Sequence, residues 1–256
     1  MLVSAVNVSE GRDGPALARI VAAAGDDLLD LHRDEHHHRS VLTVAGPDAV
    51  RRVAAAAVAT IDLRRHSGVH PRLGAVDVVP FVPYAGSTMD EAAAARDAFA
   101  AWIAGELTVP AFVYREQGPT LPQVRRTARL QLLPHPTAGA VAVGARGPLV
   151  AYNVWLAEPD LALAQEVAGR IRGDGIRALG LPVGDRVQVS MNLVDPLRVG
   201  PATAYDAVAA LAPVAGAELV GLVPRAVLDA VATDRWTELG LDARCSVEAR
   251  LRRDPP

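Results

Sequence analysis

The stretch Ala75-Val-Asp-Val-Val-Pro-Phe-Val82 decides the fold of the first half of the chain. It is a β-branched run that prolines interrupt and close, which is typical of a strand. Working back from it toward the N-terminus, apolar alternation and capping residues predict earlier elements. These are a strand at Leu2–Val8, a helix from Asp13 to about Ala24, strands at Leu28–Leu31 and Ser40–Ala45, and a helix from Gly46 to about Thr60. The resulting order β-α-β-β-α-β is that of a ferredoxin-like unit.

The same order recurs in the second half of the chain. The elements predicted there are a strand at Leu149–Leu156, a helix at Pro159–Arg172, strands at Ala178–Val183 and Arg186–Val194, a helix at Ala202–Leu211, a strand at Glu218–Val223 and a last helix at Arg225–Ala232. We therefore expect an α/β (α+β) protein of two ferredoxin-like β-α-β-β-α-β subdomains, residues 1–147 and 148–256. Each sheet would have one open face, so the subdomains are expected to pack sheet to sheet and bind ligand between them.

The segment between the two repeats contains one more helix and strand. Thr88 and Glu91 have the spacing of a capping box ahead of a helix that continues to about Leu107. A short strand is predicted at Ala111–Tyr114. From Pro119 to Gly147 the sequence is rich in Pro, Gly and Arg, and we interpret this stretch as a linker.

The composition excludes several classes of partner. The 256 residues carry a formal net charge of −3, so neither nucleic acid nor a membrane surface is expected to bind. The single Cys245 excludes an internal disulfide and fits a reducing compartment. The N-terminus has no basic leader, and no apolar run approaches the ~20 residues that span a bilayer. We expect a cytoplasmic protein, and because the chain has no lysine, its anion sites must use arginine.

The first candidate for chemistry is the loop His66-Ser-Gly-Val-His-Pro-Arg-Leu-Gly74, between a predicted helix and a predicted strand. Its glycines and proline restrict the backbone, and the residue before Pro71 is held extended, which would fix the direction of His70. Histidine exchanges protons near neutrality, because its unperturbed pKa is about 6.5. The alternative is that His70 satisfies a backbone group and Arg72 is a solvated charge.

The second candidate is the segment Asp30-Leu-His-Arg-Asp-Glu-His-His-His-Arg39, which holds four of the seven histidines. Crowded imidazoles and carboxylates are typical of a metal site. Contiguous histidines in a loop between strands point in different directions, however, and no second ligand cluster has a fixed spacing. We therefore expect no metal and interpret the segment as a polar loop that faces the substrate, with His32 among the binding residues.

Two further groups of polar residues are candidates for binding. The sequence Asn7-Val-Ser-Glu-Gly11 ends the first strand, where Asn7 and Glu10 could contact a ligand or take part in ordinary turn chemistry. In the second half, Ser190 and Asn192 lie two residues apart in a predicted strand and so share one face. Two polar residues on one face of an apolar strand indicate contact with a ligand or with another buried polar group.

Taken in chain order, a series of segments spanning nearly the whole chain resembles the formiminotransferase family. The matching segments are Asn7–Gly11, Leu28–Asp30 with Arg39, Ile61–Pro83, Gly139–Arg146, Leu149–Asn153, Val189–Asp195 and Glu218–Pro224. None of these segments is specific by itself, whereas their combination is highly specific.

The resemblance implies two similar α/β subdomains around a folate tunnel, commonly in a homodimer, and a role in histidine degradation. The implied reaction moves a formimino group from N-formimino-L-glutamate to N5 of tetrahydrofolate, which serves as co-substrate. His70 falls on the family's catalytic histidine and would act as general base and acid. The resemblance also implies arginines for the carboxylates of glutamate and folate (Arg39, Arg64, Arg65 and Arg72) and polar residues that line the tunnel (Asn7, Glu10, Asn153, Ser190 and Asn192).

The chain departs from the family pattern at several positions. Ser67-Gly-Val69 stands where the family usually reads Lys-Gly-Glu, and Asp34–His38 replaces a Gly-Pro-Ser-Thr-Asn run. His32 replaces an Asp, and the stretch between Tyr114 and Gly139 is shorter than usual. Two alternatives therefore stay open. The same scaffold and His70 could act on a different one-carbon donor, such as a formyl compound, or the chain could bind folate without turnover.

Overall fold

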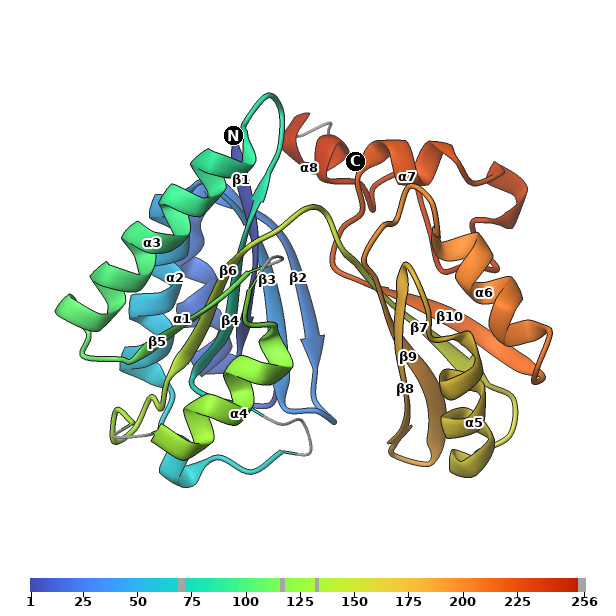
Figure 1. The fold of residues 1–256 in the computed structure, drawn as a ribbon, viewed down its shortest axis with the longest axis horizontal. Coiled ribbons are helices and arrows are strands. Elements are labelled where there is room, and N and C mark those ends of the chain that lie inside the picture. The colour runs from blue at the N-terminus through green and yellow to red at the C-terminus, as the bar shows by residue number, and fades with distance from the viewer. Residues whose placement is uncertain (69–71, 116–117, 132–133, 253–256) are drawn as a thin grey trace. The chain divides into compact units, whose positions relative to one another are not determined.

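The computed structural model describes residues 1–68, 72–115, 118–131 and 134–252. The chain divides into two compact units, Met1–Gly147 and Pro148–Pro256. Both units combine helices with a β-sheet, which confirms the predicted α/β class, and each contains the order β-α-β-β-α-β (Figure 1).

The first unit follows the predicted order and then extends it. Its elements are β1 (Leu2–Val8), α1 (Gly14–Ala24), β2 (Leu28–Asp34), β3 (Arg39–Ala45), α2 (Pro47–Thr60), β4 (Val76–Pro83), α3 (Met89–Glu106), β5 (Ala111–Tyr114), α4 (Leu121–Gln131) and β6 (Val141–Ala145). The strand order is β2-β3-β1-β4-β6-β5. The strands β4, β6 and β5 run parallel, and the other neighbours are antiparallel. The first four strands have the ferredoxin-like arrangement, with β1 and β3 in the middle.

The helices of this unit begin at the predicted capping residues. The Asp13 carboxylate accepts a hydrogen bond from Ala16 N–H (2.9 Å) at the start of α1. Thr88 and Glu91 form a complete capping box at the start of α3. These caps satisfy N–H groups that have no partner inside the helix, and so they fix where each helix starts.

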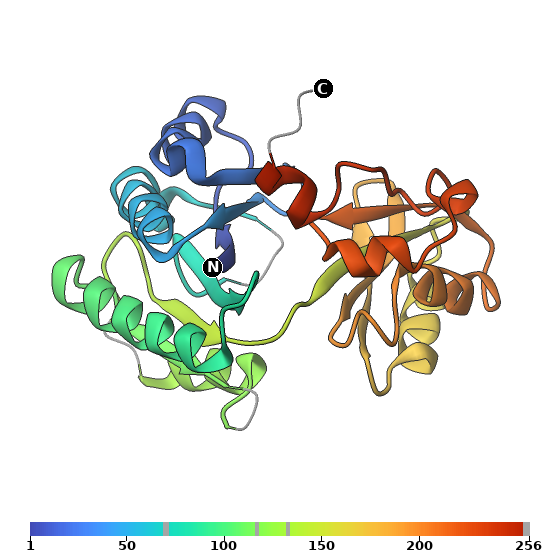
Figure 2. The ribbon, with the colours of Figure 1, turned by 90° about the horizontal axis from the view of Figure 1, so that it is seen from above.

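One face of this sheet packs against α1, α2 and α3 (Figures 1 and 2). The strands supply alternate residues to this core, and the helices supply one apolar side each. The most buried members include Val6, Leu42, Val79, Ile20 and Phe99, each 1% exposed or less. Removing these side chains from water is the main contribution that holds the layer of helices on the sheet.

The prediction of a linker from Pro119 to Gly147 is wrong. The segment forms α4 and β6, and every residue of β6 is buried between β4 and β5. The sequence of β6, Val141-Ala-Val-Gly-Ala145, is rich in small residues and so carries little of the usual strand signal. Helix α4 was not predicted because arginines separate its apolar residues in the sequence. Leu121, Val124 and Ala128 nevertheless recur at helical spacing on one side.

Helix α4 covers part of the opposite face of the sheet. Val124 and Ala128 pack there against Val78, Tyr114 and Ala142, from β4, β5 and β6. The part of this face that β1, β2 and β3 form carries polar residues instead. The expectation of one wholly open sheet face is therefore wrong for the first unit, since its polar part lies beside a helix-covered part.

The second unit contains a four-stranded sheet with the order β10-β7-β9-β8. Its elements are β7 (Val150–Leu156), α5 (Leu161–Ile171), β8 (Ile176–Val183), β9 (Arg186–Leu193), α6 (Pro201–Ala209), β10 (Val214–Val220), α7 (Arg225–Asp229) and α8 (Val247–Arg252). The strands β7 and β9 lie in the middle, as β1 and β3 do in the first unit. One face packs against α5 and α6 through a core that contains Tyr152, Val189 and Met191.

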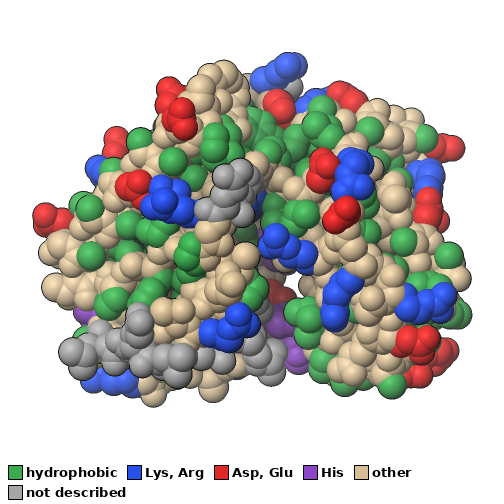
Figure 3. Space-filling model, viewed as in Figure 1, with side chains coloured by type: hydrophobic (Ala, Val, Ile, Leu, Met, Phe, Trp, Pro, Cys, Tyr) green, Lys and Arg blue, Asp and Glu red, His purple; other side chains and the backbone are tan. Residues whose placement is uncertain are grey.

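The described surface carries mixed charge. Acidic and basic side chains are interspersed over each unit on the face drawn in Figure 3, in keeping with the net charge of −3. Within the described ranges, no helix combines the length and the apolar character needed to cross a membrane.

Candidate functional site

Three of the predicted binding residues share one face of the sheet in the first unit. Asn7 and His32 both lie opposite Val41 of β3, and Arg39 lies two residues before Val41. Residues paired across antiparallel strands point to the same side of the sheet, and so do residues two apart in one strand. Asn7, His32 and Arg39 therefore project from the face that α1, α2 and α3 do not cover.

A β-bulge adds a carboxylate close to these residues. The register of β1 against β4 shifts between Asn7 and Val8, which leaves Asp77 as an extra residue on β4. Bulges redirect side chains and often lie next to active sites. The Asp77 carboxylate is buried and accepts hydrogen bonds from Leu73 N–H (2.7 Å) and Arg125 Nη2 (2.5 Å). Neither Asp77 nor Arg125 was predicted as a site residue, because the bulge and α4 were not predicted.

Arginines gather around this carboxylate. Burial lowers the pKa of Arg39 and of Arg72, and the nearby Asp77 carboxylate opposes both shifts. Arg125 is close enough to lower the pKa of Arg39 as well. Three guanidinium groups thus lie within electrostatic reach of Asp77, an arrangement that suits an anionic ligand.

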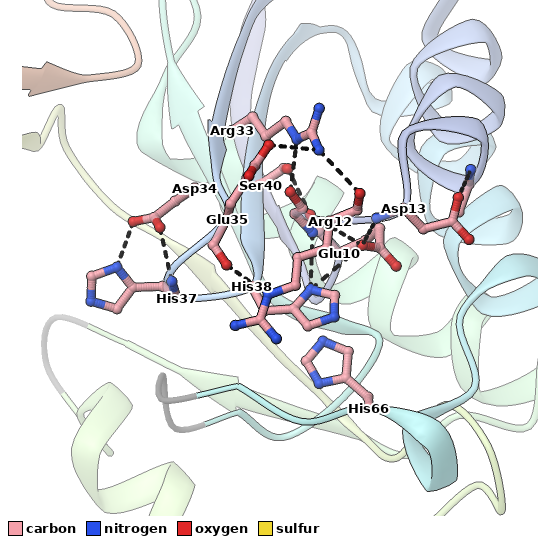
Figure 4. A network of polar contacts seen from close by, with 12 residues as sticks. Glu10, Arg12, Asp13, Arg33, Asp34, Glu35, His37, His38, Ser40 and His66 are labelled. Carbon is pink, nitrogen blue, oxygen red and sulfur yellow. Dashed lines mark hydrogen bonds and ion pairs between the residues drawn. The ribbon is translucent and has the colours of Figure 1, made fainter. Parts of the chain in front are cut away.

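Glu10, a predicted binding residue, uses its carboxylate to hold the turn between β1 and α1. Its Oε1 accepts hydrogen bonds from Arg12 N–H (2.7 Å) and Asp13 N–H (2.8 Å). Ser40 Oγ donates to the Glu10 carbonyl at 2.6 Å. These contacts fix the Glu10 side chain beside a pair of histidines (Figure 4).

Arg12 connects the turn between β2 and β3 to a distant loop. We call residues 35–38 the histidine turn. Arg12 Nε donates to Glu35 O (2.8 Å), Nη2 to His36 O (3.2 Å) and Nη1 to Ser67 O (3.3 Å). One planar guanidinium therefore joins carbonyls of two loops. Arg12 was not predicted as a site residue, because nothing in the local sequence distinguishes it from a solvated arginine.

His38 of the histidine turn stacks on His66. Their ring centroids are 3.9 Å apart and the ring planes differ by 26°. Gly11 N–H donates to His38 Nδ1 (3.1 Å), and Arg72 Nη1 contacts His66 Nδ1. Each Nδ1 faces a donor and acts as an acceptor, so the proton of each neutral ring lies on Nε2.

Both stacked histidines are harder to protonate than an exposed histidine. Burial, and then the positive charge of Arg72 and of His38, lowers the pKa of His66 to about 4, against an opposing effect of Glu10. Burial also lowers the pKa of His38. Glu10 Oε1, 3.5 Å from His38 Nδ1, opposes this shift, while Arg12 and Arg72 add to it. Both rings are therefore mainly neutral at pH 7.

Asp34 and His37 form a carboxylate–imidazole pair at the other side of the histidine turn (Figure 4). His37 N–H donates to Asp34 Oδ1 (2.8 Å), and His37 Nδ1–H donates to Oδ2 (2.5 Å). Burial by itself would raise the pKa of Asp34. The hydrogen bonds and the positive charge of His37 outweigh burial and lower that pKa to about 2. The carboxylate therefore fixes the orientation of the His37 ring.

The other arginine candidates are exposed, and the predicted catalytic histidine is not described. Arg64 pairs with Asp62 through Nε (2.9 Å) and Nη2 (2.7 Å). Arg65 ends the same short 3-10 helix, Leu63–Arg65, and is exposed. His70 lies outside the described residues.

In the second unit, Asn153, Ser190 and Asn192 share one sheet face. Asn153 pairs with Ser190 on β9 and with Glu218 on β10, and Asn192 lies two residues after Ser190. Asn153 Nδ2 donates to Glu218 Oε2 at 3.1 Å. Tyr152 points to the opposite, helix-covered face. The structure thus brings these three predicted residues together and adds Glu218, for which no role was predicted.

The histidine-rich segment does not form a metal centre in the part of the chain that the structure describes. No group of three or more His, Cys, Asp or Glu side chains there could hold a metal ion. The contiguous histidines have separate contacts, since His37 bonds Asp34 while His38 stacks on His66.

Comparison with known proteins assigns the chain to a family. The formiminotransferase domain, N-terminal subdomain, matches residues 1–146, more than half of the chain. The glutamate formimidoyltransferase of Streptococcus pyogenes serotype M1 is 35% identical, over 87% of this chain and 89% of the relative. The protein of the same name from Thermoplasma acidophilum is 31% identical, over 88% of this chain and 89% of the relative.

A longer relative matches a similar share of the chain. The formimidoyltransferase-cyclodeaminase of Sus scrofa is 35% identical over 88% of this chain, and the match covers 51% of that protein. The family match spans the site residues of the first unit, and the relatives of similar length match most of the chain. The chain therefore belongs to the formiminotransferase family.

Proposed function

We propose that this protein transfers a formimino group from N-formimino-L-glutamate to N5 of tetrahydrofolate. The observation that carries the proposal is the extent of the similarity. Relatives named glutamate formimidoyltransferase match 87% and 88% of the chain, and the match covers 89% of each relative. A transferase of one-carbon groups follows from that family membership.

The charged face of the first unit supports an anionic donor. Arg39 and Arg72 lie near Asp77 together with Arg125. Guanidinium groups bind carboxylates through two parallel hydrogen bonds, and N-formimino-L-glutamate carries two carboxylates. We assign these carboxylates to Arg39 and Arg72. Asn7 shares the face with Arg39 and would supply a neutral hydrogen bond.

The polar face of the second unit supports the folate co-substrate. Asn153, Ser190 and Asn192 offer amide and hydroxyl groups, which both donate and accept hydrogen bonds. The pterin ring of folate carries donors and acceptors along one edge, so these side chains fit it. Bound tetrahydrofolate supplies the nucleophilic nitrogen of the reaction.

Proton transfer is assigned to His70 on the resemblance of its segment. N5 loses a proton as it bonds to the amidine carbon, and the glutamate nitrogen gains a proton as its bond to that carbon breaks. One imidazole can perform both transfers, because its pKa lies near the working pH. His70 would take the proton from N5 and deliver it to the departing nitrogen.

The test is turnover of the purified chain with tetrahydrofolate and N-formimino-L-glutamate, followed by the absorbance of 5-formiminotetrahydrofolate. His70→Ala should lower kcat by about 100-fold or more, while calorimetry shows unchanged folate binding. Folate binding without turnover by the wild-type chain would overturn the assignment of the donor. Absence of folate binding would overturn the whole proposal.

A formyl donor is the second candidate, and the histidine turn favours it. The neutral ring of His38 in this turn carries its proton on Nε2, and such a group can donate to a carbonyl oxygen. N-formyl-L-glutamate in the same assay separates the two donors. A higher kcat/KM for the formyl compound would replace the first candidate with the second.

A further inference from the structure

The histidine turn and residues 66–68 are in direct contact, although about 30 residues separate them in the sequence. A Cβ atom on Gly68 would lie 2.9 Å from His38 Cβ and 3.0 Å from His37 O. Only a residue without a side chain allows this approach. Residues 66–68 lead directly into residues 69–71 and thus into His70.

We propose that Arg12, His38 and His66 are positioning residues, which lock the histidine turn to residues 66–68 and thereby hold the chain that leads into His70. The expected effect on turnover rests on the proposed function. We call the contacts of Arg12, His38 and His66 that join the histidine turn to residues 66–68 the lock. These contacts lie within the described residues and can be measured without any substrate.

Two kinds of contact close the lock. Arg12 bonds two carbonyls of the histidine turn and the Ser67 carbonyl, and each bond has a charged donor. The His38 and His66 rings stack face to face, and a fixed donor, Gly11 N–H or Arg72, engages Nδ1 of each ring. The guanidinium therefore sets the distance between the two segments, while the stack sets their orientation.

The lock depends on the charge of the imidazoles. The charged groups that face the two rings are Glu10 and Arg12, from the turn between β1 and α1, and Arg72, ahead of β4. Protonation of one ring places a cation against the other ring and near two arginines, with Glu10 as the opposing anion. The closed arrangement therefore requires neutral rings, and acid opens it.

The direction of the pH effect follows from the shifted pKa values. The pKa of His66 is about 4 in the folded protein, below the 6.5 of an unperturbed histidine, and the pKa of His38 is lowered as well. Between pH 4 and pH 6.5, the chain with the lock open, or the unfolded chain, binds more protons than the folded chain with the lock closed. The lock is therefore fully effective above pH 6.5 and weakens as the pH falls toward 4.

The substrate-free test is an NMR titration of the histidine rings in the wild type, Arg12→Ala and Arg52→Ala. His66 takes its lowered pKa from burial, Arg72 and His38, so its pKa in Arg12→Ala reports the contact between the segments rather than the lost charge. We expect the pKa of His66 to rise from about 4 toward 6.5 in Arg12→Ala, and to stay below 6.5 because Arg72 still contacts the ring. Arg52 is the matched control, because it also bonds several oxygens, namely Ala23 O, Ala24 O and Asp27 Oδ2, in another part of the unit.

The test of positioning uses two variants of His66. His66→Phe keeps a ring that can stack on His38 and removes the titrating group, whereas His66→Ala removes both. At pH 7.5 we expect kcat to fall by about 10-fold in His66→Ala with little change in KM, and by less than about 3-fold in His66→Phe.

The outcomes of the two tests separate the lock from the reaction. An unchanged pKa of His66 in Arg12→Ala, or an equal rise in Arg52→Ala, would overturn the lock whatever the enzyme does. A confirmed lock with no formimino transfer by the wild type would overturn the proposed function and leave the lock intact. Equal loss of kcat in His66→Phe and His66→Ala would show that the stack does not position the active segment.

Discussion

Asp77 on β4 and Arg125 on α4 form an ion pair of 2.5 Å that fastens the bulge of β4 to the helix beside it. The Asp77 side chain is 3% exposed and the Arg125 side chain 22%. A carboxylate this deep in the protein stays ionised only when cations and hydrogen-bond donors surround it. The pair therefore stabilises the position of α4 on the sheet. It also places a carboxylate and a guanidinium group within electrostatic reach of Arg39.

Replacing Arg125 by Ala should destabilise the first unit. The variant leaves Asp77 buried without its closest cation, and we expect the free energy of unfolding to fall by about 2–3 kcal/mol, less than for a fully buried pair because Arg39 remains nearby. Urea unfolding followed by circular dichroism measures the change. Arg126→Ala, at the exposed next position of α4, is the control and should change stability by no more than about 0.5 kcal/mol. Equal losses in the two variants would contradict the role of the pair.

A methyl group at Gly74 should disrupt the loop ahead of β4. The added Cβ would lie 2.1 Å from Ala140 O and 2.7 Å from Ala138 O, and backbone atoms of a buried strand end cannot move aside. We expect Gly74→Ala to lower the free energy of unfolding by about 3 kcal/mol or more. Gly105→Ala is the matched control, since a Cβ there meets nothing within 4 Å. Stability equal to that of the control would show that the close approach is absent in solution.

Local sequence signals predicted the two repeats, and long-range contacts account for what they missed. Asp13 and Thr88 mark helix starts because a cap bonds groups only two or three residues away. Period-two alternation likewise placed Ser190 and Asn192 on one face. Arg12, by contrast, bonds carbonyls 23 and 55 residues away, and no local pattern records such a contact. The bulge that directs Asp77, and the buried strand beside it, also depend on partners distant in the sequence.

The arginine candidates should divide by their burial. Arg64 is exposed and forms a bidentate pair with Asp62, whereas Arg39 is partly buried and projects from the face that carries Asn7. Under the proposed function, Arg39→Ala should raise KM for the glutamate donor by about 10-fold or more, because a charge-assisted hydrogen bond is lost. Arg64→Ala, the control, should leave KM within about 2-fold. Steady-state kinetics at saturating folate measures both, and the reverse order would move the carboxylate site to the exposed arginines.

The pair formed by Asp34 and His37 should make stability depend on pH in the acid range. The pKa of Asp34 is lowered from 3.8 to about 2 in the folded protein, so the unfolded chain binds more protons between these values. The stabilising contribution is thus complete above pH 3.8 and is lost as the pH falls through 2. Asp34→Asn removes this contribution, and we expect the free energy of unfolding to be lower by about 1 kcal/mol at pH 5.5. This is less than the full linkage value, because the carboxylate is partly in water. The deficit should shrink toward zero near pH 2. Urea unfolding across this range measures the deficit, with Asp185→Asn, in the exposed turn between β8 and β9, as the control. A deficit that stays constant with pH would mean that the carboxylate acts through shape and hydrogen bonding rather than through its charge.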